Sequence, residues 1–164
     1  MTLYPTRISL HLYIYIIGCA VAVCLSLMAC SDTLAHYETK GLDREQWTRS
    51  DTLTFHMPVM PQKGEYDAII DLRFTDRYPF MTLTLQAQQT VHGSGNNYTD
   101  TLTLQVYNNN GLMTGNGLNL IDYTVPLRTY TLSPHDSVTV SLCHIMSGDT
   151  LKGITDIGMR LIRH

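Results

Sequence analysis

The chain has 164 residues, with 11 Lys or Arg, 14 Asp or Glu and a formal net charge of −3. This mildly acidic balance argues against a nucleic-acid-binding protein, because such proteins usually present a basic face. The length is sufficient for one domain with a hydrophobic core of its own.

The N-terminal segment has the composition of a targeting signal. Residues 8–29 contain no Asp, Glu, Lys or Arg, and the only charged side chain before them is that of Arg7. A positive start followed by an apolar run is typical of a secretory signal peptide. The run is also about long enough to span a bilayer, which takes roughly 20 apolar residues. Its length alone therefore leaves an uncleaved membrane anchor as an alternative.

The end of the apolar run favours a lipoprotein signal peptide. Signal peptidases need a small side chain before the cut, and the run ends on the pattern of a bacterial lipobox, Leu27, Met28, Ala29 and Cys30. In that chemistry the cysteine receives a diacylglycerol, the preceding bond is cut and the new amino group is acylated. We therefore predict a signal peptide over residues 1–29 and lipidation at Cys30. A looser lipobox ends at Cys19, but cleavage there would leave an apolar tail beside the lipid.

Residues 30–50 are predicted to be the lipidated cysteine and a polar tether, since no apolar period of 2 or 3.6 residues is sustained in them. Trp47, the only tryptophan, is the exception, and it is interpreted either as a core anchor at the edge of the domain or as a partner contact. Only Cys143 follows Cys30, so the mature chain cannot form an intramolecular disulfide. The core alone must hold the domain together.

A single β domain is predicted over residues 51–164. Seven segments alternate apolar and polar residues and are separated by Gly, Pro and Asn, which is typical of strands. They are residues 51–57, 65–74, 81–91, 98–107, 121–130, 137–145 and 154–162. This pattern predicts an all-β fold, a single antiparallel β-sandwich of about seven or eight strands, Ig-like or jelly-roll-like.

A repeated pentapeptide predicts one strand pairing. The sequence TLTLQ occurs at residues 82–86 and again at residues 101–105, and the segment between the two copies is rich in Gly and Asn. Because side chains alternate across a strand, each copy has one face of Leu and one of Thr. We expect an antiparallel hairpin with its leucines directed into the core.

No pattern in the chain predicts catalysis or a resident cofactor. There is no Gly-x-Ser-x-Gly elbow, phosphate-binding loop or His-Glu-x-x-His motif, and the histidines lack the close pairs that zinc sites use. We therefore predict that the protein is not an enzyme and has no catalytic residues, metal or cofactor. The Asn- and Gly-rich segment 108–120, with Asp122 as its one nearby carboxylate, is interpreted as a loop that touches a partner.

The segment from Leu151 to Arg160, LKGITDIGMR, is the most distinctive in the chain. It is accompanied by Trp47, Phe55, Tyr66, Leu72 with Arg73, Tyr78 to Phe80, and the Gly115 to Gly117 loop. Together with the lipobox, these residues resemble the GldH family of gliding motility lipoproteins of Bacteroidetes. The resemblance covers essentially the whole mature domain.

The resemblance implies an envelope lipoprotein that acts with the gliding motility and type IX secretion machinery, and it transfers no catalytic residues. Relatives also occur in bacteria that do not glide, which implies a more general role in secretion or envelope assembly. The expected partners are the membrane, through the N-terminal lipid, and other envelope proteins of that machinery, with no nucleic acid. A carbohydrate- or ligand-binding surface lipoprotein is the alternative function.

Five residues are candidate partner contacts: Trp47, Tyr78, Phe80, Asp156 and Arg160. Asp156 and Arg160 have the same parity in the predicted last strand, so they share a face. They belong either to a structural strand, as charge pairs with neighbours, or to a binding edge. Ser31 rather than Asp follows Cys30, and the acidic residues nearby are sparse. We therefore expect the outer membrane, facing the periplasm, with the cell surface as the alternative.

Overall fold

The computed structural model describes residues 13–18 and 33–164, and the chain divides into two units, Met1–Ser31 and Asp32–His164. In the first unit residues 13–18 are helical. None of the helices in these two ranges has the length and apolar character that crossing a membrane requires. Leu27, Met28, Ala29 and Cys30 lie outside the described residues, so the signal peptide and the lipidation site remain predictions.

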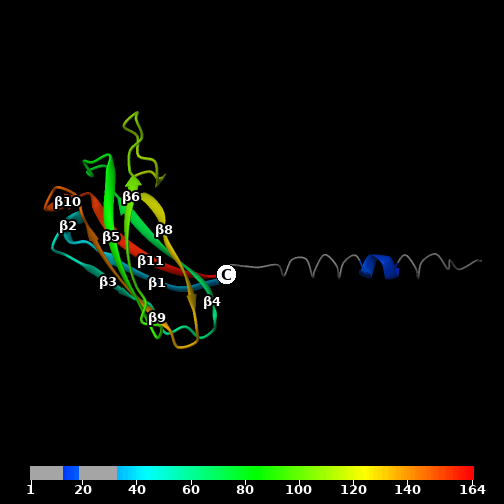
Figure 1. Ribbon diagram of the computed structural model, residues 1–164. Coiled ribbons are helices and arrows are strands. Elements are labelled where there is room, and N and C mark those ends of the chain that lie inside the picture. The colour runs from blue at the N-terminus through cyan, green and yellow to red at the C-terminus, as the bar shows by residue number, and fades with distance from the viewer. Residues whose placement is uncertain (1–12, 19–32) are drawn as a thin grey trace, which may run out of the picture. The chain divides into compact units, whose positions relative to one another are not determined.

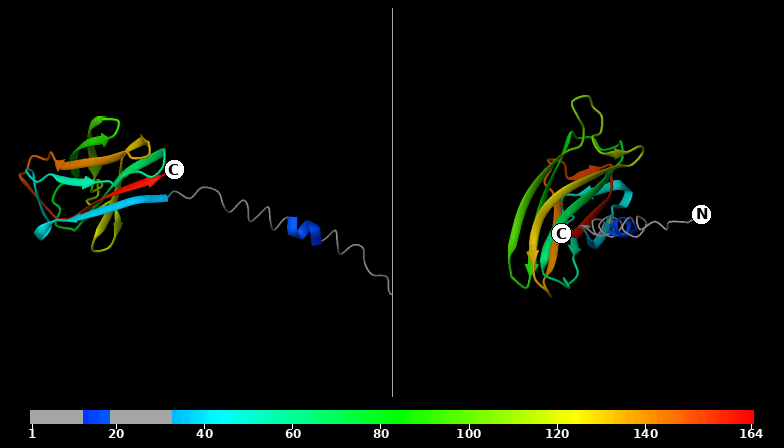
Figure 2. Two further views of the ribbon diagram at one scale, coloured as in Figure 1. Left: turned by 90° about the horizontal axis from the view of Figure 1, so that it is seen from below. Right: turned by 90° about the vertical axis from the view of Figure 1, so that its right-hand side faces the viewer.

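The second unit is an antiparallel β-sandwich, as predicted (Figure 1, Figure 2). One sheet has the order β1 (Thr33–Gly41), β11 (Ile154–Arg163), β4 (Gly64–Phe74), β8 (Ile121–Leu132) and β7 (Asn116–Gly117). The other has the order β3 (Leu53–His56), β9 (Ser137–His144), β5 (Thr82–His92) and β6 (Asn97–Gln105). Strand β2 (Gln46–Thr48) follows the 3₁₀ turn η1 (Asp43–Glu45) and pairs with β10 (Thr150–Lys152) in a short two-stranded ribbon.

All seven predicted strands are confirmed, as β3, β4, β5, β6, β8, β9 and β11. Their period-two pattern directs alternate side chains between the sheets, where burial of apolar surface drives packing. Strand β4 is a clear case, because every second residue from Tyr66 to Phe74 is buried. Leu83 and Leu85 of β5 and Val140 of β9 belong to the same core cluster.

The predicted hairpin is confirmed as the antiparallel pair β5 and β6. Leu83 lies opposite Leu104 and Leu85 opposite Leu102, with the first of each pair fully buried and the second partly buried against the core. On the other face the hydroxyl groups of Thr84 and Thr103 are 3.3 Å apart. The repeated pentapeptide therefore pairs with its own second copy.

The prediction of a tether over residues 30–50, and of a domain that begins at residue 51, is wrong for residues 33–48. Strand β1 pairs with β11 along its whole length, and β2 pairs with β10. The half-buried positions of β1 include the charged Glu38 and Lys40 rather than apolar residues. They face the edge of the other sheet, where Glu38 accepts a hydrogen bond from the His56 backbone and Lys40 lies 5.4 Å above the Phe55 ring. A partly solvated edge strand needs no apolar alternation, which is why the pattern is missing.

Trp47 lies in the core, which agrees with the interpretation as an anchor and contradicts the one as a partner contact. Its side chain is fully buried in β2, and its indole nitrogen donates to the Asp51 carbonyl at 2.8 Å. The ring meets the imidazole of His144 edge to face, with centroids 5.4 Å apart. His144 Nε2 lies 3.2 Å from the Trp47 carbonyl, and its buried Nδ1 has no hydrogen-bond partner.

The burial of His144 predicts a pH dependence of stability. Desolvation lowers the pKa of the buried imidazole below its ordinary value of 6.5. As the pH falls below about 6.5, the unfolded chain therefore binds a proton that the folded protein does not, and the free energy of unfolding decreases. We expect His144→Gln to make this decrease shallower, as measured by urea unfolding at pH 7.5 and 5.5. The matched control is His92→Gln, the same change at an exposed position; equal slopes for the parent and His144→Gln would contradict the prediction.

Candidate functional site

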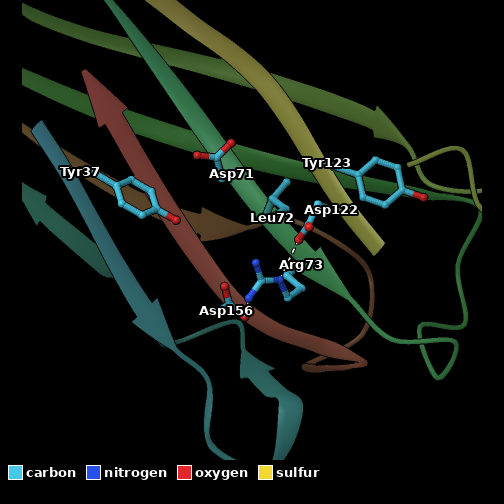
Figure 3. Close-up of a pocket in the computed structure, with 7 residues that line it drawn as sticks. All are labelled: Tyr37, Asp71, Leu72, Arg73, Asp122, Tyr123 and Asp156. Carbon is cyan, nitrogen blue, oxygen red and sulfur yellow. Dashed lines mark hydrogen bonds and ion pairs between the residues drawn. The ribbon is translucent and has the colours of Figure 1, made fainter. Parts of the chain in front are cut away.

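The outer face of the five-stranded sheet carries a group of charged side chains. They are Asp71 and Arg73 of β4, Asp122 of β8, and Asp156 and Arg160 of β11, and we call them the charged face. The alternation of β4 explains their position, because Ile70, Leu72 and Phe74 are buried between the sheets. Figure 3 shows Arg73 between Asp122 and Asp156 on this surface.

Strand register places Arg73 of the charged face between two carboxylates. Arg73 lies directly opposite Asp122 on one side and Asp156 on the other. Its Nε is 2.7 Å from Asp122 Oδ1, and its Nη1 is 3.7 Å from Asp156 Oδ2. The Asp122 carboxylate, followed by Asp156, raises the pKa of the Arg73 guanidinium. Arg73 thus joins three strands through cross-strand charge pairs.

Arg160 makes the tighter contact. Its Nε and Nη2 donate to the two oxygens of Asp71 at 2.5 and 2.8 Å. This fork geometry matches a carboxylate, which makes the pair stronger and more directional than a single contact. Arg160 also reaches the Thr124 hydroxyl of β8 at 3.5 Å. The two predicted residues Asp156 and Arg160 therefore share one face but bind different partners.

A shallow pocket of about 220 Å³ opens on the charged face, beside Tyr37 of β1. Tyr37 is half exposed, and its ring lies over Gly158, where a Cβ atom would be 2.9 Å from the ring. Only a glycine at this position allows the ring to lie so close to β11. The lining combines the Tyr37 ring with charged side chains of β4, β8 and β11, a combination that suits recognition of a polar group.

The other predicted partner contacts are wholly or partly withdrawn from the surface. Trp47 and Tyr78 are buried, and Tyr78 donates to the Thr82 carbonyl at 2.9 Å. Burial raises the pKa of the Tyr78 phenol. Phe80 is partly buried with its ring edge to face against that of Tyr78. Aromatic side chains in β folds either pack in the core or lie on the surface, and the sequence does not reveal which of the two applies to a given residue.

The sequence analysis missed Tyr37 and Asp71. It named Arg73 only for the family resemblance and Asp122 only as the carboxylate near the segment 108–120. The available signal was the alternation of Asp71, Leu72 and Arg73 within the predicted strand 65–74, which directs both charges outward. Tyr37 had no such signal, since it lies in the segment assigned to the tether.

A second surface feature is the loop 106–120, which joins β6 to β8 and projects from one end of the sandwich (Figure 1). Its base is held by hydrogen bonds. The Tyr123 hydroxyl donates to the Val106 carbonyl at 2.6 Å and accepts from the Thr114 backbone at 3.1 Å. Gly117 has a φ of +137° and lies so close to the Leu120 carbonyl that a Cβ atom would clash at 1.9 Å. The loop is thus built to one conformation.

The loop 106–120 presents apolar side chains and no charged ones. Leu118 is 97% exposed, and Leu112 and Leu120 are also exposed. Leucines held in solvent by an ordered loop indicate an interaction surface, because covering exposed apolar groups of this size lowers the free energy of the system. Leu112 and Leu118 line an open depression of about 550 Å³, together with Met113 and Asn119 of the loop, Ile121 of β8 and the carboxylate residue Asp76.

Strand register places the loop 106–120 far from the point where the domain begins. Ile121, Phe74 and Ile154 lie side by side at the loop end of the sheet. Thr33 pairs with Arg163 at the opposite end. The nine residues of β1 correspond to about 30 Å between the two ends.

Comparison with known proteins gives a consistent family assignment. A sequence model of the family described as GldH lipoprotein matches residues 35–161. The gliding motility lipoprotein GldH of Flavobacterium johnsoniae is 29% identical over 153 residues, which cover 88% of this chain and 94% of that protein.

Similarity to solved structures is much weaker. Eiger TNF from S. frugiperda is 13% identical over 65% of this chain and 62% of its own, with a TM-score of 0.32. Dimeric latent PorU from Porphyromonas gingivalis is 11% identical over 83% of this chain and 13% of its own, with a TM-score of 0.37. The chain spans less than two thirds of the length of either structure, and TM-scores this low carry no information about function.

The fork between Arg160 and Asp71 predicts a measurable coupling. Both side chains are partly buried, so we expect a double-mutant cycle with Arg160→Ala and Asp71→Ala to give a coupling energy of about 1 kcal/mol in urea unfolding. The matched control is the cycle on Arg77 and Glu45, where Arg77 is largely exposed and a smaller coupling is expected. Equal coupling in the two cycles would count against the role assigned to the fork.

Proposed function

The chain belongs to the GldH lipoprotein family, and from this we propose that it is a lipid-anchored, non-enzymatic component or assembly factor of the gliding motility and type IX secretion machinery. The relative from Flavobacterium johnsoniae, which bears the name of a gliding motility lipoprotein, supports the motility role. The match to this relative extends over 94% of its length.

The anchoring part of the proposal concerns Cys30. The lipobox that ends on Cys30 supports lipidation there, and a triacylated cysteine exceeds the two chains that stable anchoring requires. We place the protein in the outer membrane with the domain in the periplasm. The supporting feature is Ser31, since an aspartate directly after the lipidated cysteine is the enterobacterial signal for retention in the inner membrane.

The loop 106–120 is the observation that carries the role as an assembly component. An ordered, uncharged loop with protruding leucines suits the apolar groove of another protein, because anchors that are already rigid lose little entropy on binding. Its position favours a partner other than the membrane that holds the anchor, since about 30 Å of strand separates the loop from the end of the domain that leads to Cys30. The proposed occupant is therefore a second envelope protein.

The pocket beside Tyr37 supports a second candidate function, recognition of a polar ligand such as a carbohydrate. A half-exposed aromatic ring next to paired arginine and aspartate groups combines a stacking surface with hydrogen-bonding partners. In that case Tyr37→Ala, and not a change in the loop, would abolish binding.

A photo-crosslinking experiment tests the role of the loop. A photoreactive phenylalanine analogue at position 118 should crosslink in intact cells to an envelope protein, and Leu112→Asp with Leu118→Asp should impair gliding or secretion while the domain stays folded and membrane-bound. The matched control is Asn109→Asp, which adds a charge at an exposed position of the same loop without removing a leucine. Full gliding and secretion by the leucine variant would contradict the proposal, as would crosslinking to glycan alone.

Replacement of the predicted lipidation site tests the anchor. We expect Cys30→Ser to lose incorporation of an alkyne-labelled fatty acid and to release the domain from the membrane fraction, because the acyl chains are lost. Cys19→Ser is the matched control, since it removes the competing lipobox and should leave both measurements unchanged. If Cys19→Ser lost the fatty-acid label while Cys30→Ser kept it, the lipidation site would be Cys19 instead.

A further inference from the structure

An apolar crevice of about 210 Å³ lies between β1 and the loop 57–63, at the end of the sandwich opposite the loop 106–120. Its walls include Ala35 of β1 and Pro58, Val59 and Pro61 of the loop. Its floor is formed by Met60 and Tyr66, both of which belong to the core. The crevice is thus a gap through which the core is reached from outside.

The crevice is a built feature of the loop 57–63. The Met60 backbone donates to the Asp136 carbonyl at 2.7 Å, and the Met60 carbonyl accepts from the His135 backbone at 2.9 Å. The Tyr66 hydroxyl donates to the Gln62 carbonyl at 2.8 Å. At the start of the loop the Met57 backbone donates to the Val138 carbonyl at 2.8 Å. The loop is therefore held on both sides of Val59, which remains 57% exposed.

The rim combines apolar and basic side chains. Val59 of the rim is 57% exposed, and Leu34, which lies between the crevice residues Thr33 and Ala35 in β1 without lining the crevice itself, is exposed to the same degree. Arg163 lines the crevice and lies 3.4 Å from the carbonyl of the exposed Lys63. Apolar side chains flanked by cations are the combination that suits a lipid interface, where the cations meet phosphate groups and the apolar groups meet acyl chains.

The position of the crevice identifies what covers it. Thr33 lines the crevice, and only Ser31 and Asp32 separate it from Cys30 in the sequence. Even fully extended, the chain from Cys30 to Thr33 spans about 10 Å. A bilayer that holds lipid on Cys30 is therefore within reach of this end of the domain, whereas a long tether would have kept it away.

We propose that this end of the domain rests on the membrane leaflet that holds the anchor, with Leu34 and Val59 among the acyl chains and the crevice occupied by phospholipid chains. The inference rests on the proposed lipidation of Cys30. It adds that the domain has a fixed orientation on the membrane, with the loop 106–120 directed away from the lipid.

Depth-dependent quenching tests this orientation. The full-length lipidated protein with Cys143→Ser is labelled with an environment-sensitive fluorophore at Val59→Cys, or at Leu118→Cys as the matched control. Each is reconstituted in vesicles of phosphatidylethanolamine and phosphatidylglycerol that contain nitroxide-labelled phospholipid. We expect quenching several-fold stronger at position 59 than at position 118. Equal quenching at the two positions would overturn the inference.

Flotation of the vesicles separates this inference from the proposed anchor. If the protein does not float with them, the lipidation of Cys30 has failed. If it floats and the label at position 59 is neither quenched nor blue-shifted, only the orientation is wrong. A label at position 59 that is blue-shifted but not quenched would mean that the anchor's own acyl chain fills the crevice, which would overturn the phospholipid assignment. Label fluorescence that depends on the protein-to-lipid ratio would overturn that assignment in favour of a second copy of the chain.

Discussion

The position of β11 between β1 and β4 is the constraint on which the rest of the domain depends. Its backbone forms antiparallel ladders with both neighbours, and its own side chains Ile157, Met159 and Leu161 are buried in the core. In the five-stranded sheet β1 is joined to the others only through β11. The C-terminal strand therefore holds the N-terminal one in place, and the sheet is completed only when the two ends of the domain meet. Pairings of such long sequence separation are the slow ones in folding.

The same arrangement gives the domain two chemically different ends. Strands β1 and β11 place Thr33, Arg163 and the crevice at one end, while β4 and β8 place the loop 106–120 at the other. In the proposed role, the first end faces lipid and the second faces a protein partner. The charged face lies between them on the outer surface of the sheet, where cross-strand ion pairs hold neighbouring strands in register.

Charged residues at the lateral edges protect the sandwich from pairing with other chains. On one side Glu38 of β1 contacts the backbone of His56 in β3. On the other side Arg128 of β8 forms a bidentate pair with Asp100 of β6, at 2.7 and 3.0 Å, and lies 4.3 Å above the Tyr98 ring. Inward-pointing charges of this kind close the gap between two sheet edges and discourage edge-to-edge association. They also interrupt the apolar alternation of the strands that carry them.

The sequence by itself determined the seven strands, the hairpin of the repeated pentapeptide and the family, because alternation of apolar side chains and a distinctive motif are local properties of the chain. It did not reveal β1, whose inward positions are charged, or that Trp47 and Tyr78 are taken up by the core. Only the tertiary structure decided these points, since an edge strand is defined by its partner and burial depends on what packs above a side chain. For the same reason the charged face, with Tyr37 over Gly158, and the crevice beside Thr33 could not be predicted: each is assembled from strands that lie far apart in the sequence and adjacent in the sheet.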